Sequence, residues 1–260
     1  PSPKALAAGE QNKKIMKIAR FSVIDILRGL AIISMVFYHT VWDLVYVFDN
    51  NFRWFKGNFG YLWQQSIGIA FIFLSGFCFS LSKRKLKRGL FVFLCGGIIT
   101  VISLIFMPQN RILFGVLTFI GSALLLQTAL EPIFKKANSI LGFSFSLALF
   151  VVFKNLGNGF VLTLAAPRAL YQNYFTAFLG CPPRSFWSAD YYGFFPWFFL
   201  FLCGYFAFNF FKEKDWLEIL TKIKCPPIEF IGRHSIIIYM AHQPLIYALL
   251  NLFSWILRAI

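Results

Sequence analysis

Charged residues are scarce in this sequence. Asp, Glu, Lys and Arg make up 13% of its 260 residues, whereas a soluble domain carries about 25%. The hydrophobic share is 58%, with 35 Phe residues, and the mean hydropathy is +0.68. A helix needs about 20 apolar residues to cross a bilayer, so the length allows roughly six to eight crossings and no large soluble domain. The composition predicts an all-α, polytopic integral membrane helical bundle whose first partner is the lipid bilayer.

Cysteine patterns that hold metals or form disulfide frameworks are also missing. None of the five cysteines belongs to a Cys-x-x-Cys pair, and three lie inside apolar runs, where cysteine behaves as a small hydrophobe. We therefore expect no metal site and no bound cofactor. The first twenty residues lack a signal-peptide cleavage pattern, so the first apolar run should remain as a membrane anchor. The cysteines are Cys78, Cys95, Cys181, Cys203 and Cys225.

Seven apolar runs are long enough to be interpreted as transmembrane helices. They cover approximately residues 26–48, 61–81, 90–107, 112–130, 140–153, 193–211 and 235–257. The fifth run is the shortest, and Asn155, Gly157, Asn158 and Gly159 interrupt it. Residues 160–166 are a candidate continuation of this run as a broken helix.

The basic residues indicate the orientation of these helices. The net charge is +15, but Lys and Arg stand in short loops between apolar runs, so we expect no nucleic-acid partner. Seventeen of the 25 fall in the N-terminal tail and in the second, fourth and sixth loops, and seven fall on the opposite side. The positive-inside rule therefore predicts a cytoplasmic N-terminus and an external C-terminus. The long outer segment, about residues 154–190, is rich in aromatics and is expected to form a packed lid.

The first predicted span carries ionisable residues on one face. Asp25, Arg28, His39 and Asp43 are separated by close to whole numbers of helical turns. Ionisable groups at membrane depth are costly and normally face a cavity or the bundle interior. Two structural alternatives remain open. The residues could form a polar stripe that holds helices together, and Asp25 with Arg28 could be only an interfacial ion pair.

The seventh predicted span carries the other two histidines. His234 lies near its cytoplasmic start, and His242 lies about two turns deeper. Ser235, Tyr239 and His242 share a face of the helix. Each histidine alone is typical of a packing residue, but together the three indicate one cavity between the first and seventh spans.

The ordered motifs resemble those of a known family. Asp25, Arg28 and Gly29 followed by His39 resemble the signature of the transmembrane acyltransferases, related to acyltransferase family 3. The fuller pattern resembles the bacterial family that is similar to the catalytic domain of heparan-α-glucosaminide N-acetyltransferase. The matching blocks are Asp25 to Ile32, Tyr38 with His39, Trp42 to Leu44, Phe71 to Gly76, Phe119 to Gly121, Asp190 with Tyr191, Pro196 with Trp197, Ile231 to Ser235, and His242 to Pro244.

The resemblance implies an acyl-CoA-dependent membrane enzyme in a multi-pass, bacterial plasma-membrane location. Such a protein moves an acetyl or short acyl group from cytosolic acetyl-CoA to an amino or hydroxyl group of a sugar or cell-envelope glycan. The chain then divides into a basic cytoplasmic tail, residues 1–20, and a transmembrane acyltransferase-like domain, residues 21–260. The lysosomal enzyme has extra spans and a luminal domain that we do not expect in this sequence, so the resemblance does not identify the acceptor.

The residues suit this chemistry. A neutral histidine can act as a general base near physiological pH, and we assign that role to His39, with Asp43 one turn on to hold its tautomer. The phosphates of CoA call for guanidinium partners. The expected acyl-CoA contacts are Arg28, Arg84, Arg88 and Arg233, and the other expected cavity residues are Asp25, Ser75, Tyr239, His242, Gln243 and Asp190.

Three alternatives stay open at this point. His242 could be the base instead of His39. Intramembrane Asp and His also serve proton relays, so the protein could be a transporter that uses the same stripe. It could also be a membrane scaffold without catalysis.

Overall fold

The structure is a computed structural model that describes residues 21–259. The predicted basic tail, residues 1–20, lies outside the described residues. Seven helices in the described part are long and apolar enough to cross a membrane, which confirms the seven predicted spans and the all-α class. They are α2 (Ser22–Tyr46), α4 (Asn58–Phe77), α5 (Lys85–Phe106), α6 (Val116–Phe134), α7 (Ser139–Phe153), α9 (Phe194–Glu213) and α12 (Ser235–Ala259).

Shorter elements connect the seven helices. The short α-helices are α3 (Arg53–Lys56), α8 (Tyr174–Leu179), α10 (Ile219–Lys222) and α11 (Pro226–Arg233). The 3-10 turns are η1 (Phe79–Leu81), η2 (Pro108–Asn110), η3 (Leu156–Asn158), η4 (Arg168–Leu170) and η5 (Trp216–Glu218). A two-stranded hairpin consists of β1 (Phe160–Val161) and β2 (Leu164–Ala165).

The hairpin corrects one prediction. The expected continuation of the fifth span through residues 160–166 is wrong, because these residues pair as antiparallel strands. The backbone gives the reason: Gly159 has φ 89° and Leu162 has φ 53°, and left-handed residues of this kind end a helix and turn a hairpin. The fifth span therefore ends before the hairpin, and the outer segment folds separately.

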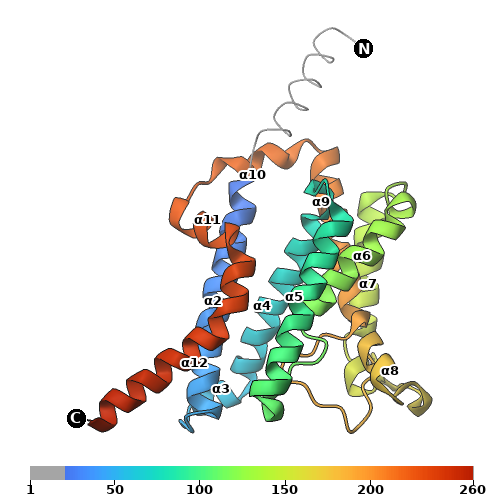
Figure 1. The fold of residues 1–260 in the computed structure, drawn as a ribbon. Coiled ribbons are helices and arrows are strands. Elements are labelled where there is room, and N and C mark those ends of the chain that lie inside the picture. Colours follow the sequence, from blue (N-terminus) through green and yellow to red (C-terminus); the bar gives the residue numbers. More distant parts are fainter. Residues whose placement is uncertain (1–20, 260) are drawn as a thin grey trace, which may run out of the picture.

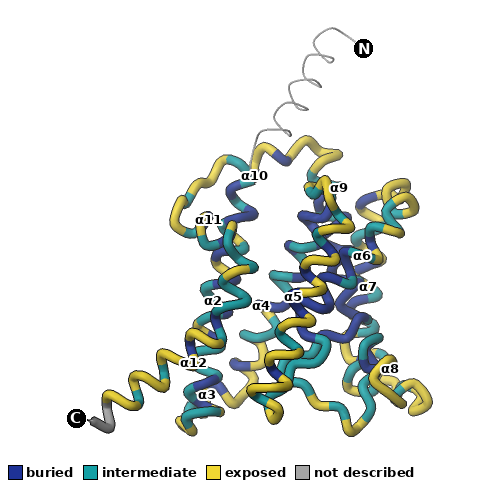
Figure 2. Tube along the Cα trace, viewed as in Figure 1, coloured by how far each residue is buried: buried dark blue, intermediate teal, exposed yellow. Residues whose placement is uncertain are grey.

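The helices form two groups in Figure 1. Helices α4, α5, α6, α7 and α9 pack side by side, whereas α2 packs with α11 and α12. The first group holds an aromatic core that includes the fully buried Phe79, Phe119, Phe201 and Tyr205. Figure 2 shows the buried positions concentrated inside this group. Contacts between α2 and α4 join the two groups.

Helix α11 packs closely against the first turns of α2. A Cβ on Gly232 would lie 1.8 Å from the Asp25 carbonyl oxygen, and one on Gly29 would lie 2.3 Å from the Ile228 carbonyl oxygen. Only glycine fits such backbone approaches, so two small residues set the spacing of α2 and α11. His234 stands between α11 and α12, so the contact also sets where α12 begins.

The second half of α12 leaves the bundle. Pro244 lies inside this helix, and Figure 1 shows the helix diverging from the other helices toward the C-terminus. Proline is a common cause of helix bends because it removes one backbone hydrogen bond. Leu249, Phe253 and Trp255 are exposed on this half, as expected for residues that face lipid.

Substituting Gly232 tests the contact between α11 and α2. Gly232→Ala should lower the free energy of unfolding by about 1–3 kcal/mol, because its methyl group overlaps backbone that cannot move aside. The matched control is Gly97→Ala in α5, where an added Cβ meets nothing within 4 Å and helix propensity favours alanine by up to about 1 kcal/mol. Thermal unfolding in detergent measures both. Equal midpoints for the two variants would contradict this close contact.

Candidate active site

Two histidines from opposite ends of the sequence meet between α2 and α12. The ring centroids of His39 and His242 are 4.8 Å apart. His242 is buried, with 8% of its surface exposed, whereas His39 is partly exposed. The helices that were expected to share a cavity therefore do bring these imidazoles together, and His39 is the more accessible of the two.

The backbone sets the tautomer of His242. Its Nδ1 lies 2.6 Å from the Tyr239 carbonyl oxygen. A carbonyl oxygen only accepts hydrogen bonds, so in the neutral ring Nδ1 carries the hydrogen and Nε2 carries a lone pair. That Nε2 is buried and has no hydrogen-bond partner. His242 thus presents an unused acceptor beside His39.

Asp43 is held by α12 and not by His39. Its Oδ1 accepts a hydrogen bond of 2.8 Å from Nε2 of Gln243, and its Oδ2 has no partner. The predicted hydrogen bond from His39 to Asp43 is therefore absent among the described residues. Asp43 is 0% exposed, so the amide of Gln243 fills the place that the histidine was expected to take.

Unpartnered polar atoms concentrate at this site. In the described part of the chain, five buried side-chain nitrogen or oxygen atoms lack a hydrogen-bond partner, and three of them belong to Asp43, His242 and Gln243. Buried polar atoms are nearly always paired in native proteins. Their concentration beside His39 marks a place where a polar ligand or water is needed to complete the structure. The other two atoms belong to Gln127 in α6, for which the structure gives no such explanation.

Asp190 reaches the same region from the outer segment. Its Oδ2 accepts the Val116 N–H at 3.2 Å, and Asp190 lines the same small hollow as Tyr239 of α12. Thr118, two residues after Val116, packs against the middle of α5. A Cβ placed on Gly96 of α5 would lie 2.5 Å from the Thr118 backbone nitrogen. Asp190 therefore lies at the level of the helix centres although it comes from a loop.

Hydrogen bonds to residues 109–114 hold the segment that carries Asp190. The Leu113 N–H donates to the Ser188 hydroxyl, which donates back to the Leu113 carbonyl, each at 2.9 Å. The Tyr192 N–H donates to the Phe114 carbonyl at 2.9 Å, and the indole N–H of Trp187 donates to the Gln109 carbonyl at 3.0 Å. This part of the outer segment is held in place by hydrogen bonds to residues 109–114, and its role as a lid stays a prediction.

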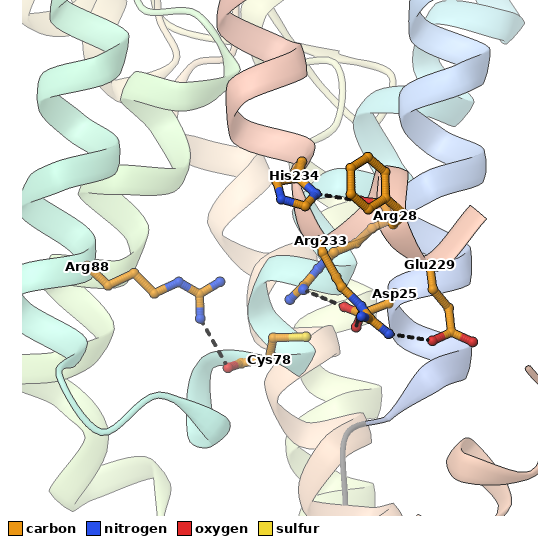
Figure 3. A network of polar contacts seen from close by, with 8 residues as sticks. Asp25, Arg28, Cys78, Arg88, Glu229, Arg233 and His234 are labelled. Atoms are coloured by element: carbon orange, nitrogen blue, oxygen red, sulfur yellow. Dashed lines mark hydrogen bonds and ion pairs between the residues drawn. The ribbon is translucent and has the colours of Figure 1, made fainter. Parts of the chain in front are cut away.

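A second polar cluster lies where α11 meets α2. Arg28 Nη1 is 3.4 Å from Asp25 Oδ1, and Arg233 contacts Asp25 at 3.7 Å and Glu229 at 2.8 Å. Arg88 of α5 donates to the Cys78 carbonyl at 3.4 Å. Figure 3 shows Arg88 and Arg28 extending toward Cys78 from opposite sides. Three guanidinium groups thus share the cluster with two carboxylates, and the net positive charge suits an anion.

Three other residues, Arg84, Ser75 and Glu229, differ from what the sequence predicted for the two clusters. Arg84 is exposed and makes no ion pair or hydrogen bond with the cluster among the described residues. Ser75 is partly buried in α4 and makes no hydrogen bond to the histidine pair. Glu229 was missed, although it stands four residues before Arg233, the spacing of a helical ion pair.

A comparison with protein families identifies the chain. The family model described as "Heparan-alpha-glucosaminide N-acetyltransferase, catalytic" matches residues 20–244. The chain belongs to this family. Membership supports a membrane acetyltransferase that acts on glycans, and the match spans both polar clusters. No curated protein and no solved structure matches the chain.

Substitutions of Asp43 and Gln243 test whether the hydrogen bond between them holds α2 and α12 together. Gln243→Leu should lower the free energy of unfolding by roughly 1–3 kcal/mol, because it leaves the buried Asp43 carboxylate without its donor. Combining it with Asp43→Leu should restore most of the loss, because neither polar group is then left alone. Thermal unfolding of wild type, both single variants and the double variant measures this coupling. Additive effects would show that the two side chains do not act as a pair.

Proposed function

We propose that the protein transfers an acetyl group from acetyl-CoA to an amino or hydroxyl group of a glycan, at the His39–His242 pair. The observation that carries this proposal is that the imidazoles of His39 and His242 lie next to each other at membrane depth. The buried Nε2 of His242 has no hydrogen-bond partner, and neighbouring side chains also have unpartnered polar atoms. Membership of the acetyltransferase family supports the reaction class. A position between the two membrane faces suits a donor and an acceptor that arrive from opposite sides.

The donor enters from the arginine cluster. Arg28, Arg88 and Arg233 stand at the helix ends that the positive-inside rule places in the cytoplasm, where CoA is found. Guanidinium groups bind phosphate through paired, charge-assisted hydrogen bonds. Among the described residues, the Cys78 carbonyl is the only hydrogen-bond acceptor of Arg88, so Arg88 is the arginine best placed to take a phosphate without losing a carboxylate partner.

His39 is the base in this mechanism. As the partly exposed ring, it takes a proton from the acceptor's amine or hydroxyl, and the freed lone pair attacks the thioester carbonyl carbon. The carbon–sulfur bond then breaks, and the CoA thiolate takes the proton from the imidazolium. The products are the acetylated acceptor and free CoA. Because a thiolate leaves readily near neutral pH, a single base is sufficient.

His242 takes the orienting role that the sequence assigned to Asp43. Its Nδ1–H is bound to the Tyr239 carbonyl, so its Nε2 lone pair can accept an N–H from the neighbouring His39 ring. That contact would leave the other nitrogen of His39 free to accept the substrate proton, and it would stabilise the imidazolium that forms. Asp43 positions His242 indirectly, because it binds Gln243 on the turn of α12 that carries His242.

Transport is a second candidate function, and one observation favours it. Asp43 and His242 each keep a buried polar atom without a hydrogen-bond partner, and intramembrane Asp and His residues also serve as proton relays in transporters. Labelled acetyl-CoA distinguishes the two functions. An acetyltransferase incorporates label into an added sugar in detergent solution, where no sealed compartment exists, whereas a transporter does not.

Replacing the histidines tests their roles. His39→Ala should lower kcat by about 10²–10⁴-fold, the usual contribution of a general base, while acetyl-CoA still binds. His242→Ala should lose less, because it removes only the orienting contact, and His234→Ala is the control at the α11–α12 junction. Turnover with labelled acetyl-CoA and binding by calorimetry are measured on folded variants. Near wild-type turnover in His39→Ala would end this mechanism.

Replacing Arg88 tests the donor site. Arg88→Ala should weaken acetyl-CoA binding about ten- to hundredfold, because a charge-assisted phosphate contact is worth about 1.5–3 kcal/mol. Arg53→Ala in α3, at the other end of the bundle, is the matched control. Calorimetric titration of both variants gives the dissociation constants. If Arg88→Ala binds acetyl-CoA as tightly as Arg53→Ala does, the donor site lies elsewhere.

A further inference from the structure

Basic side chains gather at the end of the bundle that the positive-inside rule places in the cytoplasm. They come from two connections, α4 to α5 and α6 to α7, which Figure 1 shows at the same end of the bundle. An ion pair between Lys85, the first residue of α5, and Glu131, in the last turn of α6, joins the two connections. The exposed residues around this pair are here called the basic patch. They are Lys83, Arg84, Lys87, Lys135 and Lys136.

The basic patch lacks acidic partners. Glu131 is the one acidic residue in the sequence between Asp49 and Asp190, and Lys85, which is not part of the patch, pairs with it. Glu213 of α9 reaches the start of α7, where its carboxylate accepts a hydrogen bond from the Ser139 hydroxyl. None of the ion pairs in the described part of the chain includes a residue of the patch. The described residues therefore leave its positive charges unbalanced.

An apolar ridge runs from the basic patch along the outside of α5. Four residues follow Lys87 at intervals of three, four, seven and eleven positions, which places them on one face of the helix. Each of them is about half exposed, as expected for side chains that face lipid. Long basic side chains at the ends of membrane helices extend to the level of the headgroups. Lys87 thus stands directly above a surface for acyl chains. The ridge consists of Leu90, Phe91, Leu94 and Ile98.

Helix stability does not account for these charges. The first turn of α5 holds Lys85, Lys87 and Arg88 and no acidic residue. The helix dipole makes this end of the helix positive, so basic side chains are unfavourable there. The positive-inside rule concerns the side of the membrane on which charges lie. It does not require them to border a lipid-facing ridge or to remain unpaired, whereas an anion from outside the protein accounts for both features.

We propose that the basic patch binds the headgroups of anionic phospholipids in the cytoplasmic leaflet. Clusters of about four to eight Lys and Arg next to a membrane helix are typical of such sites. The apolar ridge favours a lipid over a soluble anion, because only a lipid has acyl chains to pack against Leu90 and Phe91. Arg84 then contacts headgroups and not acyl-CoA. This binding is independent of acetyl transfer and weakens at high salt.

Titrations with two lipids test this proposal. Purified full-length protein in detergent is titrated with phosphatidylglycerol, which is anionic, and separately with phosphatidylcholine, which is zwitterionic. Native mass spectrometry gives the apparent Kd of each. Each cation near an anionic surface adds about fivefold to binding. The triple variant Lys83→Gln/Lys87→Gln/Lys136→Gln should therefore bind phosphatidylglycerol about 10- to 100-fold more weakly, with little change for phosphatidylcholine. Replacing the same lysines with Arg should preserve the wild-type affinities.

The matched control removes three exposed charges from the other end of the bundle, by Arg53→Gln/Lys56→Gln/Lys154→Gln. It should bind phosphatidylglycerol as wild type does. An equal loss in this control would overturn the proposal, because net charge alone would then explain the effect. Equal affinity of the wild type for both lipids would overturn it as well.

A calorimetric titration with acetyl-CoA separates the basic patch from the donor site. The glutamine variant of the patch leaves Arg84 and Arg88 in place, so it should bind acetyl-CoA as the wild type does. Weaker acetyl-CoA binding together with unchanged affinity for phosphatidylglycerol would show that the patch serves the donor, and would overturn the proposal.

Discussion

The close packing of α11 and α12 on α2 is the contact on which the rest of the site depends. Gly29 and Gly232 allow backbone to approach backbone, and this approach sets the position from which α12 carries His242 toward His39. The same contact brings Glu229 and Arg233 to Asp25. Ionisable groups that lipid would exclude thus find partners across a single helix interface. Larger residues at the two glycines would separate both polar clusters together.

Charged residues of opposite sign lie at the two ends of the site. Arginines gather at one end, where α11 meets α2, and Asp190 descends from the outer segment at the other. The histidine pair lies between them. The positive charge at the arginine end is what the proposed phosphate-bearing donor requires. A protein organised in this way brings two polar substrates together without moving either completely across the membrane.

The sequence predicted the helices well and the contacts less well. Long apolar runs decide which segments cross a membrane, so the seven spans could be read directly, and three histidines in two spans indicated which helices meet. The partner of Asp43 could not be predicted, because His39 and Gln243 are both plausible donors and only the packing of α12 selects one. Likewise, the depth of Asp190 depends on hydrogen bonds between residues far apart in the chain, such as Ser188 with Leu113, which hydropathy does not register. The hairpin after α7 was missed because its pattern is too short to distinguish from a helix end.

The central claim is that acetyl transfer takes place where α2 meets α12. The most direct measurement is a structure of the protein with acetyl-CoA bound. The account predicts CoA phosphates among Arg28, Arg88 and Arg233. It also predicts that the acetyl carbonyl lies close enough to the His39 ring for a single acceptor amine or hydroxyl to fit between them. Acetyl-CoA bound with its acetyl group on the lipid-facing side of the bundle, or outside the space between α2 and α12, would contradict it.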